Sequence, residues 1–98
     1  MPWERVTHHR VGPMKIGVIH EINDPETFNE RGTAMMDDIP ETVQNHQACV
    51  SSDGAAATCV WEAESLDELS QFIDPSLGDA SEQQYFEINE EVSVGVPD

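Results

Sequence analysis

The chain has 98 residues, and its 20 Asp and Glu residues against 4 Lys and Arg residues give a formal net charge of -16. This length allows one domain with one modest core. So acidic a surface repels phosphate backbones and anionic lipid, which argues against nucleic acid and membranes as partners.

The acidic, lysine-poor composition resembles that of proteins from salt-accumulating halophiles. In molar salt the Debye length shortens to roughly 3 Å, which screens most of the repulsion between carboxylates. No apolar run approaches the ~18 residues that a membrane-spanning helix needs, and Met1–Pro13 lacks the apolar segment of a signal peptide. We therefore expect a cytoplasmic protein, whose Cys49 and Cys59 are reduced packing residues.

The periodic part of the chain starts at Met14. Residues 1–13 show no strand or helix pattern and are expected to form a flexible tail, on which the adjacent His8 and His9 make a poor metal site. Met14–Ile22 is rich in isoleucine and valine and predicts a buried strand. A histidine, His20, lies within this strand.

A helix is expected after this strand. Asp24 is a cap residue, Pro25 suits the first helical position, and Pro40 closes the helix. The apolar residues of this segment fall on one helical face: Phe28, Gly32, Met35, Met36 and Ile39.

A hairpin and a second helix are expected next. The strand over 43–50 and the strand over 55–63 flank the turn signal SSDG. Ser65 and Glu68 match a capping box for a helix that ends at Asp74–Pro75. A last strand covers Gln84–Ile88, and residues 91–98 form a tail or an edge strand.

The order strand, helix, strand, strand, helix, strand is the ferredoxin-like βαββαβ pattern. It predicts one α+β domain over residues 14–90. Its four-stranded antiparallel sheet has the spatial order four-one-three-two, with both helices on one face. The other face must be polar, cover a ligand or meet another subunit.

Three segments carry a resemblance to a known family: GVIHEINDPETF, SSDGAAATCVWEAESLDEL and QYFEI. They resemble small domains of the DUF4242 type, a family similar to a nickel-binding actinobacterial protein. The resemblance covers roughly residues 14–89 and implies a ferredoxin-like fold that dimerises through the open sheet faces into an α/β barrel. Of the histidine ligands in the nickel-binding relative, the one near the start of the chain matches His20.

His20 and His46 are the histidines of the predicted sheet. They lie on strands separated by a third, at least ~9.6 Å apart, so a metal site needs a further ligand from Glu21, Glu62 or a second subunit. The commoner outcome is a histidine packed in the sheet with its ring nitrogens hydrogen-bonded.

The hairpin register decides the neighbours of His46. A two-residue Asp53–Gly54 turn places His46 opposite Trp61, whereas a three-residue Ser52–Gly54 loop places it opposite Val60, and SSDG suits both. An aromatic residue beside a histidine suits a pocket for a flat organic ligand. In neither register do Cys49 and Cys59 lie in position for a disulfide.

These observations predict a homodimeric domain that binds a small molecule or a metal ion at its open sheet face. The candidate ligand-binding residues are His20, His46, Trp61 and Glu62, and His20 is the candidate ligand for nickel or zinc, although no cofactor is the simpler expectation. The sequence contains no self-contained catalytic motif. Two alternatives stay open: a cofactor-independent monooxygenase or isomerase with His20 or His46 as proton carrier, and a protein-interaction module.

Overall fold

The structure is a computed structural model that describes residues 13–96. The predicted N-terminal tail, apart from its last residue Pro13, lies outside the described residues. The elements are β1 (Met14–Ile22), α2 (Pro25–Met36), β2 (Gln44–Val50), β3 (Ala56–Ala63), α3 (Leu66–Leu77), a short 3-10 helix η1 (Gly78–Ala80) and β4 (Ser81–Glu87).

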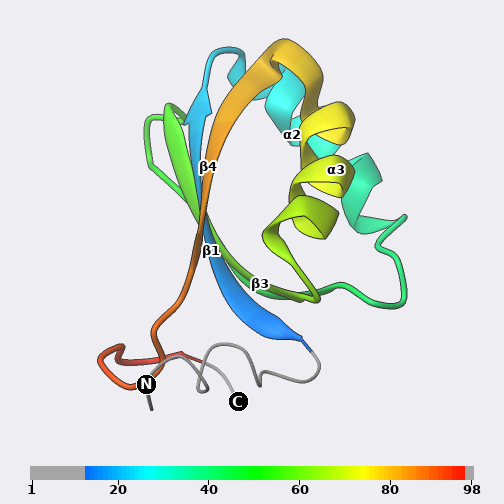
Figure 1. The fold of residues 1–98 in the computed structure, drawn as a ribbon. Helices are drawn as coiled ribbons and strands as arrows, with labels where there is room; N and C mark the ends of the chain where they lie inside the picture. Colours follow the sequence, from blue (N-terminus) through cyan, green and yellow to red (C-terminus); the bar gives the residue numbers. More distant parts are fainter. Residues whose placement is uncertain (1–12, 97–98) are drawn as a thin grey trace.

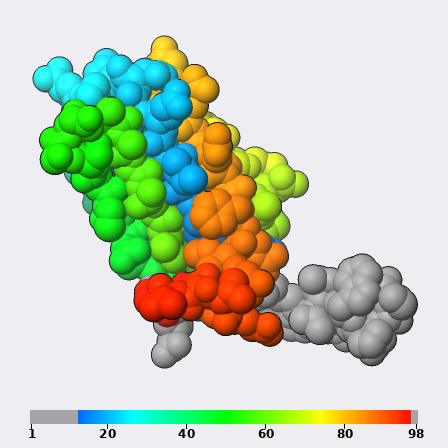
Figure 2. Space-filling view, turned by 90° about the vertical axis from the view of Figure 1, so that its left-hand side faces the viewer, coloured from blue at the N-terminus to red at the C-terminus, as the bar shows by residue number. Residues whose placement is uncertain are grey.

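The fold is α+β with the ferredoxin-like order βαββαβ, as predicted. The strands form one antiparallel sheet in the order β2-β3-β1-β4, which is the predicted order read from the other edge. Helices α2 and α3 cover one face of this sheet (Figure 1). We call this the helix face. We call the opposite one, which no helix of residues 13–96 covers, the open face (Figure 2).

The core lies between the helices and the helix face, because alternate residues of a strand point to the same side of a sheet. In β1 these are Ile16, Val18 and Ile22, all buried. Trp61 of β3 and the apolar stripe of α3 complete the layer. The α3 residues in it are Leu69, Ile73 and Leu77, each fully buried.

Both helices start where their capping residues predict. Asp24 accepts a hydrogen bond from the backbone N–H of Thr27 at 3.2 Å, and Pro25 follows in the first turn. At α3 the Ser65 hydroxyl accepts from the N–H of Glu68 at 3.0 Å. The Glu68 carboxylate in turn accepts from the N–H of Glu64, at 2.9 Å. Each cap satisfies N–H groups that a helix start leaves unpaired.

The predicted end of α3 at Asp74–Pro75 is wrong, because the helix continues through Pro75 to Leu77. Proline lacks a backbone N–H and disfavours this geometry. The extra turn, however, buries the Leu77 side chain completely, and burial of a leucine is worth roughly 1.5–3 kcal/mol. The helix ends instead at Gly78, whose φ of 59° suits a residue without a Cβ.

The β2–β3 hairpin follows neither predicted pairing of His46. Near the turn the register is the one expected for the two-residue turn, with Val50 opposite Ala57 and Gln47 opposite Val60. A bulge at His46 then shifts it, so that Asn45 faces Trp61. Such a bulge leaves the extra residue without a cross-strand partner and redirects its side chain.

The C-terminal segment contains no strand over its described residues 88–96, so the edge-strand alternative is not observed there. The segment lies along one end of the open face (Figure 2) and is joined to β1 by the N–H of Ile88, which donates to the carbonyl of Lys15 at 2.9 Å. No helix of the described residues is long and apolar enough to cross a bilayer.

Candidate functional site

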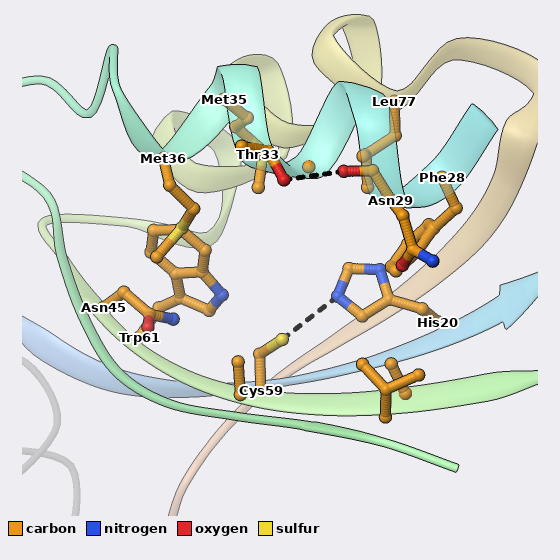
Figure 3. Close-up of a pocket in the computed structure, with 14 residues that line it drawn as sticks. His20, Phe28, Asn29, Thr33, Met35, Met36, Asn45, Cys59, Trp61 and Leu77 are labelled. Carbon is orange, nitrogen blue, oxygen red and sulfur yellow. Dashed lines mark hydrogen bonds between the residues drawn. The ribbon is translucent and has the colours of Figure 1, made fainter. Parts of the chain in front are cut away.

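A cavity of about 210 Å³ lies between α2 and the helix face of the sheet (Figure 3). We call it the α2 pocket. It exists because the residues that would fill the gap are small: Gly32 on α2, Ala48 on β2 and Ala57 on β3. Its rim near Met36 and Val50 is exposed to solvent. None of its lining residues is Asp, Glu, Lys or Arg.

The face of α2 that the sequence predicts as apolar lines this pocket. Phe28 and Met35 are buried, whereas Met36 is 43% exposed. Gly32 has no heavy atom within 4 Å of the position that a Cβ would occupy. The helix therefore presents apolar side chains around free space at Gly32, together with the polar Asn29 and Thr33.

Trp61 forms part of the sheet-side wall. Its side chain is buried, and its ring packs edge-to-face on Phe72 at a centroid distance of 6.2 Å. The indole Nε1 is fully buried and makes no hydrogen bond with the described residues. In Figure 3 this nitrogen lies on the side of the ring that faces the cavity. An unpaired buried donor of this kind costs about 1–3 kcal/mol.

His20 lines the same pocket from β1 and is 2% exposed. Its ring packs edge-to-face on Phe28 at 5.4 Å. Nδ1 lies 3.2 Å from Oε1 of Gln83, and Nε2 lies 3.4 Å from Sγ of Cys59. Burial lowers the pKa of His20, against smaller opposing effects of Gln83 and Asp74, so the ring is neutral at neutral pH.

The Cys59 thiol lies near both His20 and Trp61. Burial raises the pKa of Cys59 to about 11, against an opposing hydrogen-bonding effect of the nearby Trp61 indole. The thiol nevertheless lies outside ordinary hydrogen-bond geometry from the indole Nε1, which has no partner among the described residues. Cys59 is therefore a protonated thiol and not a thiolate nucleophile at neutral pH. Cys49 points to the open face, and both cysteines are free.

A hydrogen-bond network behind His20 fixes the Gln83 side chain. Its Nε2 donates to Asp74 at 2.8 Å, and the Tyr85 hydroxyl donates to the same carboxylate oxygen at 2.6 Å. The Ser81 hydroxyl donates to Oε1 of Gln83. Burial, together with the Asp74 carboxylate, raises the pKa of Tyr85, so that its hydroxyl stays a donor.

His46 and Glu62 lie on the open face. The bulge at His46 turns its Nε2 to within 2.8 Å of the Glu62 carboxylate. Lys15 lies 3.9 Å from Glu62 and 3.5 Å from Glu90, so Glu62 has two basic neighbours. These contacts link β1, β2 and β3 on the open face.

The four predicted site residues therefore do not come together in one chain. His20 and Trp61 line the α2 pocket on the helix face, whereas His46 and Glu62 lie on the open face. The residues that join His20 and Trp61 are Cys59, which the sequence indicates only as a packing residue, and Gln83, which no sequence motif marks. The alternation of side chains in β4 does not by itself say which residues point to the helix face. Gln83 is assigned to that face because it pairs with His20.

Within residues 13–96 no group of three or more His, Cys, Asp and Glu side chains is arranged to hold a metal ion. His20 has one thiol neighbour, whereas a zinc site needs three or four ligands. The expectation of nickel or zinc at His20 thus finds no complete ligand set in this part of the chain.

No family model, curated protein or solved structure matches the chain.

Proposed function

We propose that this protein binds a small, largely apolar organic molecule in the α2 pocket. The observation that carries the proposal is the indole N–H of Trp61, which is buried, unpaired and faces an apolar cavity. Buried polar groups are nearly always hydrogen-bonded. A ligand that supplies an acceptor to this N–H recovers the free energy that the unpaired donor costs.

The size of the pocket limits the ligand. An engineered apolar cavity of about 150 Å³ binds benzene, and typical pockets for drug-sized ligands begin near 300 Å³. The α2 pocket, at about 210 Å³, lies between these values. We therefore propose a molecule of one or two rings.

The expected homodimer is compatible with this site and remains part of the proposal. Ile19 and Phe86 on the open face are 43% and 47% exposed, and a second copy would cover them there. The α2 pocket lies on the other side of the sheet and stays accessible in such a dimer. We likewise propose that the chain is related to DUF4242-type domains, that it is cytoplasmic and that it comes from a halophile.

One observation favours the alternative of a cofactor-independent enzyme. His20 is a neutral base on the wall of the pocket, where a bound molecule would lie beside it. A proton-transfer role for His20 in the same pocket is therefore the second candidate function. It shares the binding site of the first.

The binding proposal is tested by titrating the protein with 2-naphthol in molar salt and following the indole N–H of Trp61 by NMR. The chain contains two tryptophans, so a Trp3→Phe background assigns the signal. We expect a saturable shift in the wild type. The variant Gly32→Leu fills the pocket from a position with free space and should abolish the shift.

The matched control is Ala34→Leu, which adds the same side chain at an exposed position of α2 outside the pocket. It should keep the shift. An unchanged indole signal in the wild type, or equal binding by Gly32→Leu, would overturn the proposal.

A further inference from the structure

The network behind His20 determines which ring nitrogen carries the proton. Gln83 donates through Nε2 to the Asp74 carboxylate, which as an ionised group only accepts. The Gln83 side chain therefore presents its carbonyl oxygen, Oε1, to His20, and this oxygen also accepts from Ser81. Because a carbonyl oxygen cannot donate, Nδ1 of His20 must be the protonated nitrogen.

This tautomer leaves Nε2 of His20 as an acceptor. Its neighbour is the Cys59 thiol at 3.4 Å, and that thiol is protonated because burial raises its pKa. A thiol is a weak hydrogen-bond donor. Nε2 of His20 is thus held by a weak donor, which a better donor on a ligand would displace.

Asn29, Thr33 and Asn45 also line the pocket, and the rest of its lining is largely apolar. Deep in the pocket, Nε2 of His20 is an acceptor and Nε1 of Trp61 is an unpaired donor. A hydroxyl group is complementary to both, since its oxygen accepts while its hydrogen donates. The aromatic rings of Phe28 and Trp61 favour a flat partner.

The charge of the site excludes anions. The lining residues include no lysine or arginine, and His20 is neutral. A buried carboxylate or phosphate without a cationic partner is strongly disfavoured, and the net charge of -16 repels anions from the whole protein. The ligand must therefore enter the pocket uncharged.

From these observations we infer that the α2 pocket selects a neutral aromatic alcohol whose hydroxyl donates to Nε2 of His20 and accepts from Nε1 of Trp61. Gln83 acts as the positioning residue that holds His20 in the required tautomer. This inference rests on the proposed function, because it specifies the ligand class of the same pocket.

The test compares four probes of similar size by NMR titration: naphthalene, 2-methoxynaphthalene, 2-naphthol and 2-naphthoate. We expect 2-naphthol to bind most tightly, by roughly five- to ten-fold over 2-methoxynaphthalene, which accepts but cannot donate. Naphthalene should be weaker again, and 2-naphthoate should not bind. The order should hold in molar salt, where long-range repulsion of the anion is screened.

The positioning role is tested with Gln83→Leu and the matched control Gln84→Leu, whose side chain is exposed and lies on the open face. Gln83→Leu should remove the preference for 2-naphthol over 2-methoxynaphthalene, and Gln84→Leu should keep it. Long-range ¹H–¹⁵N correlation on the wild-type protein reads the His20 tautomer directly, so a misfolded Gln83→Leu leaves the idea testable.

An Nε2-protonated His20, or equal affinity for 2-naphthol and 2-methoxynaphthalene in the wild type, would overturn this inference while the proposed function stands. Failure of all four probes to bind would overturn both.

Discussion

Acidification should destabilise this protein through His20, and replacement of His20 by glutamine should remove that effect. His20 is 2% exposed, and burial lowers its pKa below the ordinary value of 6.5. In the unfolded chain the same ring takes up a proton near 6.5. Below about pH 6.5 the unfolded state therefore binds more protons than the folded state does. The stability that the neutral His20 ring contributes is fully present above this pH and is lost as the pH falls towards the folded pKa.

The size of the effect follows from this linkage. If His20 stays neutral in the folded protein, lowering the pH from about 7.5 to about 5.5 costs at most about 1.4 kcal/mol of unfolding free energy. For a domain of this length that corresponds to a melting temperature lower by roughly 5–10 °C. The carboxylates that titrate at lower pH are shared by wild type and variant, so their contribution cancels in the comparison.

The assay is thermal unfolding followed by circular dichroism in molar salt at both pH values. We expect the wild type to lose more stability on acidification than His20→Gln does. The control variant His46→Gln removes a histidine from the open face. It should still show the fall in melting temperature on acidification that His20 causes. If His20→Gln and wild type lost the same stability, the neutral, buried state of His20 would be refuted.

Four further results are expected. With a net charge of -16, the melting temperature should fall as salt is lowered from molar to millimolar, and a flat salt dependence would refute the halophilic interpretation. Nickel or zinc should leave melting unchanged in both the wild type and His20→Gln, with the variant only a few degrees less stable; a large metal-induced rise that His20→Gln abolishes would restore metal binding. In chemical denaturation, Gly54→Ala should lower the unfolding free energy by about 1 kcal/mol, because Gly54 has a φ of 75°. Gly32→Ala within α2 should raise it by about 0.5–1 kcal/mol. Equal effects of the two substitutions would contradict the assigned backbone geometry. Small-angle scattering in molar salt should give a dimer, and a compact monomer of 10.9 kDa would count against the covered open face.

The element order and strand arrangement follow from local sequence signals. The Asp24–Pro25 and Ser65 caps, the SSDG turn and the alternation of β1 predict the two helices and the central strands of the sheet. These signals work because each depends on residues close together in the chain. The end of α3 does not follow from such signals, because the burial of Leu77, a tertiary effect, outweighs the local preference of Pro75.

The site was predicted only in part. The sequence predicts His20 and Trp61 as ligand-binding residues of the open sheet face, whereas the structure places both on the helix face, where they line the α2 pocket. The position of His46 depends on the bulge in β2. No turn sequence encodes that bulge. The Gln83–His20 contact joins strands 63 residues apart in sequence, and its pairing is set by packing of the completed fold.

The most direct test of the binding site is a set of intermolecular nuclear Overhauser effects between 2-naphthol and the protein at saturation. We expect contacts from the ligand ring protons to Phe28, Met35 and Trp61, which line the α2 pocket. Contacts to Ile19 and Phe86 instead, which are exposed on the open face, would contradict the assignment of the site to the α2 pocket.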